Sequence, residues 1–325
     1  MIKKAFITGI TGQDGIHLTK FLKAKNYQIF GLIRGQKENQ YDNFRTLFPE
    51  VELLTGDLAD FSSLINVLKQ TEPDEVYNLG AVSHVGMSFN QPELTANITG
   101  LGPLRLLDAI KTLGLVEKTR FYQASSSEMF GKVQQTPQNE QTNFYPRSPY
   151  GVAKTFAHFS CVNYREAYNM HVSTGILFNH EGENRGYEFV TRKITQNLAR
   201  IKLGLIKQFS LGSLSPKRDW GYAGDYVEAM WRMVQQDVSD TFVIATGQTH
   251  SVGDFLLKGM KYLGLGEEID KYVKFDKEMV RPSEVDLLIG DASKAKRVLD
   301  WQPKTDLDNL VRIMIENDLK IESTI

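Results

Sequence analysis

Short apolar segments alternate with longer amphipathic segments through the first half of the chain. The apolar runs cover residues 5–7, 29–33, 51–54, 76–79, 121–124 and 172–178. Each run has the length of a strand, and the stretches between them are long enough to hold crossover helices. Continuous apolar strands of this kind are typical of a parallel sheet that is covered by helices on both faces. We therefore expect an α/β fold with a doubly wound parallel sheet of the Rossmann type.

The second half of the chain mixes helical patterns, short strands and loops. A polar, glycine-containing stretch from Asn179 to Gly186 follows the apolar run 172–178. We assign residues 1–178 to the sheet domain and residues 179–325 mainly to a smaller C-terminal substrate-binding lobe, with a segment at about 220–250 returning to the sheet domain. Ligands of doubly wound sheets bind at the carboxyl ends of the strands, beside the reversal in strand order, and we expect the cleft there.

Composition narrows the classes of protein that this chain can belong to. The 325 residues are 41% hydrophobic and carry 38 basic against 39 acidic side chains, a balance that favours neither nucleic acid nor membrane surfaces as partners. Cys161 is the only cysteine, which excludes an internal disulfide framework and a multi-cysteine metal site. The chain starts directly with a strand pattern, and no apolar run approaches the length of a membrane span. We expect a soluble, cytoplasmic protein without a metal site.

A glycine-rich loop joins the first strand to the first helix pattern. Gly9, Gly12 and Gly15 have the spacing G-x-x-G-x-x-G. Glycine allows the tight turn and the close approach of a ligand, while the N–H groups and the positive end of the helix attract a pyrophosphate. The alternative is a strand-to-helix turn that binds nothing, but the surrounding βαβ pattern favours a dinucleotide. The loop contacts expected with the cofactor are Gly9, Thr11, Gly12, Gln13, Asp14 and Gly15.

The end of the second strand favours one dinucleotide over the other. NAD-binding domains usually carry an acidic residue there, whereas this strand ends in Arg34. A guanidinium pairs with a 2′-phosphate, so the sequence predicts NADP, although Arg34 could also be an ordinary surface arginine. Asp57 and Leu58 follow the third strand, where adenine is commonly held; a simple turn or helix cap is the alternative for Asp57.

Candidate catalytic residues follow the fifth strand and open the helix after it. Ser148 and Pro149 suit the N-cap and first position of a helix that carries Tyr150 and Lys154 one turn apart on one face. An adjacent ammonium favours phenolate over phenol, and the tyrosine can then act as a base toward a hydroxyl group. Ser126 follows the fifth strand and can hydrogen-bond the same hydroxyl. Alone, the Tyr/Lys pair could equally be a solvated helix face.

Glu128 distinguishes dehydration from simple oxidoreduction. A ketone at C4 of a hexose acidifies the C5 proton, and a carboxylate can remove that proton and then protonate the departing C6 hydroxyl. A carboxylate stabilised at the start of a helix is the alternative.

Several segments together carry a family resemblance. Residues 9–15, 122–131, 144–150, 175–181 and 189–193 strongly resemble the GDP-mannose 4,6-dehydratase family of extended short-chain dehydrogenases/reductases. The similarity continues through residues 218–221, 225–227, 243–247 and 281–285. It implies transient oxidation of a GDP-sugar at C4 by bound NADP, loss of water across C5 and C6, and return of the hydride to C6. Ser126 stands at the catalytic threonine position of the family.

The resemblance also implies roles for residues that spacing alone does not single out. Cofactor contacts are expected at Asp57, Leu58, Leu79, Gly80, Ala81, Ser83, His180 and Arg185, beside Tyr150 and Lys154. Substrate contacts are expected at Ser83, Ser126, Glu128, Asn179, Val190, Lys193, Arg218, Arg281 and Glu284. Several of these residues have other interpretations without the resemblance. Arg218, Arg281 and Lys193 could be surface cations, and His180 could be a structural histidine. Val190 could be a core residue, and Asn179 and Glu284 could be loop or cap residues.

Some positions depart from the family pattern. Gly35 replaces a second arginine that in the family reaches a neighbouring subunit, so a tetramer formed through that contact is doubtful. The expected assembly is a homodimer or homotetramer. Val82, Leu94 and Val280 also differ near the expected ligands, as does the stretch 182–184. These departures leave open a related GDP-sugar such as a GDP-manno-heptose as the substrate.

Two other functions remain as alternatives. A 4-epimerase or reductase would also use the Tyr/Lys pair, and a redox-inactive NADP-binding sensor would keep the glycine loop, but neither needs Glu128.

Overall fold

The computed structural model describes residues 2–35, 41–276, 285 and 287–324 of the chain. Its centre is a seven-stranded sheet with the order β11-β6-β5-β4-β1-β2-β3, in which every neighbouring pair is parallel. The strands are β1 (Lys4–Thr8), β2 (Gln28–Ile33), β3 (Glu52–Thr55), β4 (Glu75–Asn78), β5 (Arg120–Ser126), β6 (Val172–Leu177) and β11 (Thr241–Ile244). The reversal in strand order lies between β1 and β4, which confirms the doubly wound fold.

The strand ends differ slightly from those expected from apolarity. β5 continues to Ser126 because its polar last residues pair with Ile176 and Leu177 of β6. β4 ends at Asn78, one residue before the apolar run ends, so Leu79 opens the following loop. Backbone pairing, and not side-chain polarity, sets these two boundaries.

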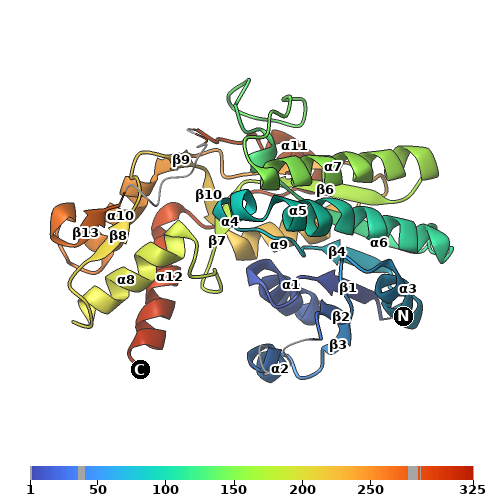
Figure 1. Ribbon diagram of the computed structural model, residues 1–325, viewed down its shortest axis with the longest axis horizontal. Helices are drawn as coiled ribbons and strands as arrows, with labels where there is room; N and C mark the ends of the chain where they lie inside the picture. The colour runs from blue at the N-terminus through green and yellow to red at the C-terminus, as the bar shows by residue number, and fades with distance from the viewer. Residues whose placement is uncertain (1, 36–40, 277–284, 286, 325) are drawn as a thin grey trace.

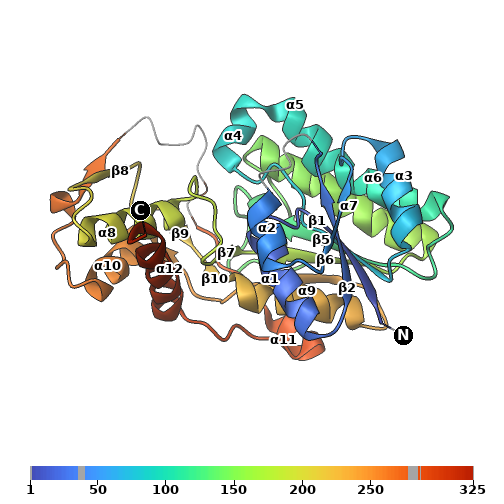
Figure 2. The ribbon, with the colours of Figure 1, turned by 90° about the horizontal axis from the view of Figure 1, so that it is seen from below.

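Helices cover both faces of the sheet (Figures 1 and 2). One face carries α1 (Gln13–Ala24), α2 (Asp42–Leu47), α9 (Ala223–Gln235) and α11 (Ser293–Leu299). The other face carries α3 (Phe61–Thr71), α6 (Leu101–Thr112) and α7 (Pro149–Tyr168). The short helices α4 (Val85–Asn90), α5 (Pro92–Thr95) and η2 (Ala96–Gly100) lead from β4 into α6, and η3 (Ser127–Met129) follows β5.

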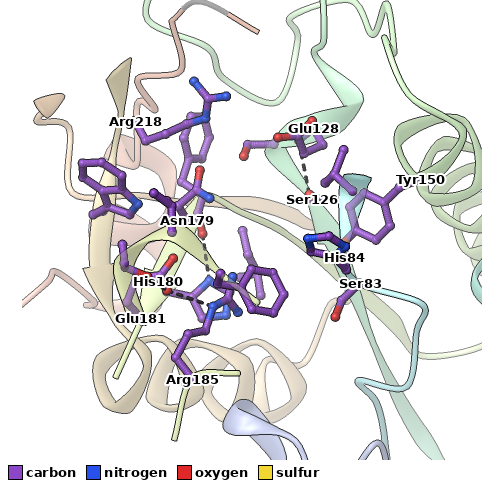
Figure 3. Close-up of a pocket in the computed structure, with 18 of the residues that line it drawn as sticks. Ser83, His84, Ser126, Glu128, Tyr150, Asn179, His180, Glu181, Arg185 and Arg218 are labelled. Carbon is purple, nitrogen blue, oxygen red and sulfur yellow. Dashed lines mark hydrogen bonds and ion pairs between the residues drawn. The ribbon is translucent and has the colours of Figure 1, made fainter. Parts of the chain in front are cut away.

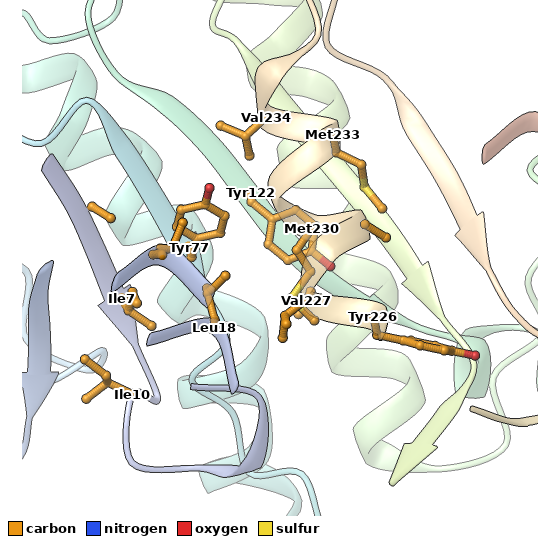
Figure 4. Close-up of a cluster of buried hydrophobic side chains, with 14 of the residues drawn as sticks. Ile7, Ile10, Leu18, Tyr77, Tyr122, Tyr226, Val227, Met230, Met233 and Val234 are labelled. Atoms are coloured by element: carbon orange, nitrogen blue, oxygen red, sulfur yellow. The ribbon is translucent and has the colours of Figure 1, made fainter. Parts of the chain in front are cut away.

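Apolar side chains from α1 and α9 fill the first face of the sheet. Leu18 of α1 and Met230 of α9 are both fully buried in this cluster, where they pack with Tyr77 and Tyr122 from the central strands (Figure 4). Removing such side chains from water is the main stabilising term of the domain, at roughly 25 cal/mol per Å² of apolar surface. The glycine loop and the first turn of α1 are thereby fixed against the sheet.

A second lobe is built from helices and short strand pairs. Its helices are α8 (Val190–Lys202), α10 (Val252–Tyr262), α12 (Leu307–Glu322) and the single turn η4 (Ile269–Lys271). Its strand pairs are β7 (Asn179–Glu181) with β10 (Trp220–Tyr222), β8 (Phe209–Leu211) with β13 (Val273–Phe275), and β9 (Lys217–Arg218) with β12 (His250–Ser251). The chain enters this lobe after β6, returns to the sheet in α9 and β11, and leaves it again at β12. The lobes are therefore interleaved along the chain.

Candidate active site

A cavity of about 490 Å³ lies at the carboxyl ends of the central strands, and its walls come from both lobes. The loop after β4, the end of β5 and the start of α7 form one wall; β7, the start of α8 and β9 form the facing wall. In Figure 3, Glu128, Ser126 and Tyr150 lie across the pocket from Arg218, Asn179 and His180. The predicted site residues that line it are Asp14, Leu79, Ala81, Ser83, Ser126, Glu128, Tyr150, Lys154, Asn179, His180, Arg185, Val190, Lys193 and Arg218.

The glycine loop leaves no room for side chains at two of its positions. Gly9 has a φ of +67°, and a Cβ placed on it would lie 2.8 Å from the main-chain nitrogen of Gly80. A Cβ on Gly15 would lie 2.3 Å from the carbonyl oxygen of Ile10. Gly12 is the N-cap of α1 and has no side chain to cover the first N–H groups of the helix. The loop therefore offers main-chain donors and the positive end of a helix.

The other residues expected to contact the cofactor are not among those that line the cavity. Thr11 and Gln13 belong to the loop and the first turn of α1, and Gly80 follows β4. Arg34 is exposed directly after β2. Leu58 is buried, and a Cβ on Gly80 would lie 2.9 Å from its Cδ1 atom. The Oδ1 atom of Asp57 accepts the N–H of Ala59 at 2.8 Å, which is the turn alternative for this residue.

An ion pair joins the first turn of α1 to the second lobe. His180 Nε2 lies 2.8 Å from Asp14 Oδ2, and His180 Nδ1 lies 2.8 Å from the carbonyl oxygen of Phe178. Burial lowers the pKa of His180, but Asp14 and the Phe178 carbonyl outweigh it, so the pKa is raised above the ordinary value. Burial likewise raises the pKa of Asp14, and the charge of His180 overcomes this to hold it well below the usual range. Both ring nitrogens face acceptors, which suits a protonated imidazolium.

Ser126 and Glu128 are fixed by the turn that follows β5. Ser126 Oγ accepts the N–H of Glu128 at 3.2 Å and so acts as the N-cap of η3. Glu128 is 8% exposed and lines the same pocket as Tyr150. The capping serine thus fixes the main chain at Glu128, from which the carboxylate extends.

Tyr150 and Lys154 extend from the start of α7 toward β5. Ser148 Oγ accepts the N–H of Gly151 at 3.0 Å and Pro149 is the first helical residue, which confirms the predicted helix start. The ammonium of Lys154 lies 5.7 Å from the ring centre of Tyr150 and donates to the carbonyl oxygen of Ala124 at 2.6 Å. Both side chains are buried, and they lie on one face of the helix.

Burial has opposite effects on these two ionisations. It raises the pKa of Tyr150 well above its ordinary value, against the hydrogen bond from Ser126, and the charge of Glu128 raises it further. Burial lowers the pKa of Lys154 to about 8, so its ammonium remains charged at neutral pH. A nearby cation is the standard means of favouring a buried phenolate, and Lys154 is suited to provide it.

The facing wall concentrates positive charge. Val190 and Lys193 lie in the first turn of α8, and Arg218 lies in β9 with only 6% of its surface exposed. Arg218 Nη1 donates to the carbonyl oxygen of Val285 at 2.6 Å, which aims the guanidinium. Arg281 and Glu284 lie outside the described residues. Positive side chains beside a helix N-terminus suit a diphosphate ligand.

The pocket also contains side chains that the sequence did not single out. Glu181 is buried and accepts from Thr191 Oγ1 at 2.6 Å, and it forms an ion pair with Arg185 Nε at 2.8 Å. His84 Nδ1 accepts the N–H of Met87 at 3.1 Å, and its ring meets Phe189 edge-on at 5.8 Å. The signal for His84 was its position directly after Ser83 in the loop that follows β4. For Glu181 the sequence offered only its place in the polar stretch after residue 178 and at the end of the family-like segment 175–181.

Two kinds of feature are missing from the described residues. Within that part of the chain, no helix is both long and apolar enough to cross a bilayer. Across the same residues, His, Cys, Asp and Glu side chains form no group of three or more that could hold a metal ion.

Solved structures with the same architecture define the class of the fold. RMD from Pseudomonas aeruginosa complexed with NADPH has a TM-score of 0.82 and 23% identity over 99% of both chains. dTDP-glucose 4,6-dehydratase from Bacillus anthracis in complex with NAD has a TM-score of 0.84 and 19% identity, covering 99% of this chain and 98% of the other. The chain thus shares the two-lobe fold with a doubly wound sheet of these two proteins.

Sequence relatives give the particular family. The model of the GDP-mannose 4,6 dehydratase family matches residues 6–314. The GDP-mannose 4,6 dehydratase of Homo sapiens is 48% identical over 98% of this chain and 92% of its own length. The enzyme of the same name from Vibrio cholerae is 46% identical over 99% of this chain and 95% of its own length. The chain belongs to the GDP-mannose 4,6-dehydratase family.

Proposed function

We propose that the chain is an NADP-dependent GDP-mannose 4,6-dehydratase, which converts GDP-mannose to GDP-4-keto-6-deoxymannose. The observation that supports this most directly is that Glu128 lines the same pocket as Ser126, Tyr150 and Lys154. Tyr150, Lys154 and a hydroxyl residue would serve any oxidoreductase of this class. A carboxylate beside them supplies the acid–base group that elimination of water requires.

The glycine loop fits a dinucleotide. A Cβ at Gly9 or Gly15 would meet main-chain atoms, so this loop can present its N–H groups at close range. Under this proposal Gly9, Thr11, Gly12, Gln13, Asp14 and Gly15 hold the pyrophosphate, and the residues after the neighbouring strands hold the remainder of the cofactor. When bound there, NADP would supply the hydride chemistry, as the acceptor for hydride from C4 of the sugar and the donor of the same hydride to C6.

Each catalytic side chain then has a defined role. Tyr150 removes the proton of the 4-hydroxyl while Ser126 orients that hydroxyl, and the Lys154 ammonium favours the phenolate form. Glu128 removes the proton from C5, which the 4-ketone has acidified, and transfers that proton to the hydroxyl that leaves C6. The proton held by Tyr150 then returns to C5 when hydride is delivered to C6, which restores the phenolate. Across the whole reaction water is lost and no external oxidant is consumed.

NADP is favoured over NAD by the exposed guanidinium at the end of β2. Arg34 follows the strand beside β1, at a place where an acidic residue would instead bind the ribose hydroxyls. A guanidinium can form two charge-assisted hydrogen bonds to a 2′-phosphate.

The facing wall is the proposed site of the GDP-sugar. Lys193 and Arg218 would neutralise its diphosphate, and Asn179 and Val190 would contact the sugar or nucleoside. Arg281 and Glu284 remain predicted substrate contacts from the sequence.

A homodimer in the cytoplasm completes the proposal. Val152, Phe156 and Phe159 form an exposed apolar row on α7, with 55%, 47% and 56% of their surfaces accessible. Their spacing puts them on one stripe of the helix, and a second copy of the chain is the occupant we propose for it. Sedimentation of the parent chain and of a Phe156→Glu variant tests this, because the variant should shift toward monomer.

Isotope transfer tests the proposed reaction directly. The NADP-loaded protein is incubated with GDP-mannose deuterated at C4, and the product is analysed by NMR. We expect a 4-keto product with deuterium at C6 and no accumulation of reduced cofactor. Unchanged sugar, an epimerised sugar, or stoichiometric release of NADPH would each contradict the proposal.

A further inference from the structure

We propose that Arg192 and Asp318 are positioning residues for the cofactor site, because they hold the main chain of residues 183–185 so that Arg185 faces the pocket. The C-terminal helix α12 would then take part in cofactor binding without touching the cofactor. This inference rests on the proposed function, in which Arg185 is a cofactor contact.

One guanidinium joins three parts of the second lobe. Arg192 Nη1 donates to the carbonyl oxygen of Glu183 and, at 3.2 Å, to that of Arg185. Its Nε lies 2.7 Å from Oδ1 of Asp318. The rigid fork of a guanidinium can satisfy acceptors in several directions at fixed geometry, which an ammonium cannot do. Arg192 on α8 therefore fixes the loop relative to α12.

The Asp318 end of this ion pair is also buried and has further partners. The side chains of Arg192 and Asp318 are 4% and 1% exposed. Thr195 Oγ1 donates to Oδ2 of Asp318 at 2.6 Å, while Oδ1 faces the Arg192 guanidinium as an ion pair. Asn317, also on α12, donates its side-chain N–H to the carbonyl oxygen of Glu183 at 3.1 Å. The helix thus holds this part of the loop both directly and through Arg192.

The side chain of Arg185 is held by one residue on each side of the loop, Glu181 and Phe189. Its Nε lies 2.8 Å from Glu181 Oε2, and its Cζ lies 3.5 Å from the ring centre of Phe189. Figure 3 shows Arg185 directed from below the pocket, beside Glu181 and His180. These contacts hold the guanidinium between Glu181 and Phe189, while Arg192 holds the carbonyl from which the side chain extends. A shift of that carbonyl would therefore strain the position of the guanidinium.

The same loop also reaches the sheet domain. Glu183 Oε2 lies 3.7 Å from Nε2 of His17 on α1, and the hydroxyl of Tyr222 donates to Glu183 Oε2 at 3.3 Å. The loop therefore spans the two lobes beside the first turn of α1. A buried ion pair is weak evidence for net stabilisation, whereas this one links the loop to α12 at defined distances. Placement of the loop is accordingly the role we assign to Arg192 and Asp318.

Conservative substitutions separate placement from stability. Arg192→Lys retains the positive charge and loses the planar guanidinium with its several N–H donors. Arg200→Lys is the matched control, because Arg200 pairs with Glu322 at 3.4 Å between the same two helices. We expect Arg192→Lys to raise the Kd for NADP roughly tenfold and to speed amide hydrogen exchange in residues 182–187. Arg200→Lys should change neither by more than about twofold, while circular dichroism of both variants matches the parent.

A double-mutant cycle tests whether Arg192 acts through Arg185. Arg185→Gln should weaken NADP binding, and adding Arg192→Lys should weaken it little further. Fully additive losses, or an Arg192→Lys variant that is less stable but binds NADP normally, would overturn the inference. If Arg185→Gln itself binds NADP normally, the cofactor role of Arg185 fails and this inference with it. Transfer of the C4 label by the parent chain would in that case still uphold the proposed reaction.

Discussion

His180 Nε2 lies 2.8 Å from Asp14 Oδ2, which joins the first strand of the second lobe to the first turn of α1. The two residues are 166 positions apart in the chain. His180 also stacks on the ring of Tyr226, with ring centres 4.7 Å apart. The pair thus fixes β7, and with it Asn179, relative to the glycine loop.

Asp14→Asn should lower the pKa of His180. The pKa of His180 is raised by the Asp14 charge in the folded protein, so the pair contributes stability that is fully present below the unfolded pKa of 6.5 and is lost as pH rises through the folded value. NMR titration of the His180 ring protons should show the decrease, and thermal unfolding should become less dependent on pH in this range. An unchanged His180 titration in the variant would show that Asp14 does not set it.

Glu128→Gln should abolish elimination while leaving the fold intact. The amide has nearly the same shape as the carboxylate but cannot accept the C5 proton, so kcat should fall by roughly 10²- to 10⁴-fold. NADP affinity should stay within about twofold, because Glu128 is not among the proposed cofactor contacts. Exchange of the C5 proton in deuterated water provides the second measurement. Normal turnover by this variant would remove the basis of the proposed mechanism.

Lys154 should set an alkaline limit to activity. Its pKa is lowered by burial to about 8, so kcat/KM should decline above this pH as the ammonium that favours the phenolate is lost. This loss of activity should occur without unfolding. Burial of the charged ammonium lowers the stability of the folded protein, because the pKa of Lys154 is below its unfolded value. That destabilisation disappears as pH rises from about 8 to 10.5 and the amine loses its proton. Lys154→Arg, which does not titrate in this range, should move the limit to higher pH at reduced overall rate. A limit at the same pH in that variant would assign it to another group.

Arg34→Ala should reduce discrimination between the two dinucleotides. Loss of a charge-assisted pair to the 2′-phosphate should cost about 1.5–3 kcal/mol of NADPH binding and leave NADH binding nearly unchanged. The two Kd values can be measured by fluorescence titration. Equal weakening of both cofactors would indicate a general effect on β2 and not recognition of the phosphate. Arg45→Ala, on the neighbouring helix α2, is a suitable surface control.

The sheet and the start of α7 could be predicted because their signals are local. Continuous apolar runs marked every strand of residues 1–178, and Ser148 with Pro149 marked the first turn of the helix that carries Tyr150. In each case the pattern that predicts the strand or helix lies within the same residues that form it.

The second lobe could not be predicted in the same way. Its strands are two or three residues long, which is too short for any periodicity to appear. Contacts such as those of Asp14 with His180 and of Arg192 with Asp318 depend on pairing between distant segments, which residue spacing does not encode. Glu181 was missed for this reason, since its importance comes from Thr191 and Arg185 after the chain has turned back.

The position of β11 at the margin of the sheet has a consequence for biosynthesis. β6 is buried along its whole length, but its outer partner, residues 241–244, is synthesised more than sixty residues later. While a nascent chain is still attached to the ribosome, the hydrogen-bonding edge of β6 has no native strand to cover it. A slow or interrupted translation of residues 179–240 would therefore expose an aggregation-prone edge, and a chaperone that binds extended apolar segments would be expected to associate during that interval.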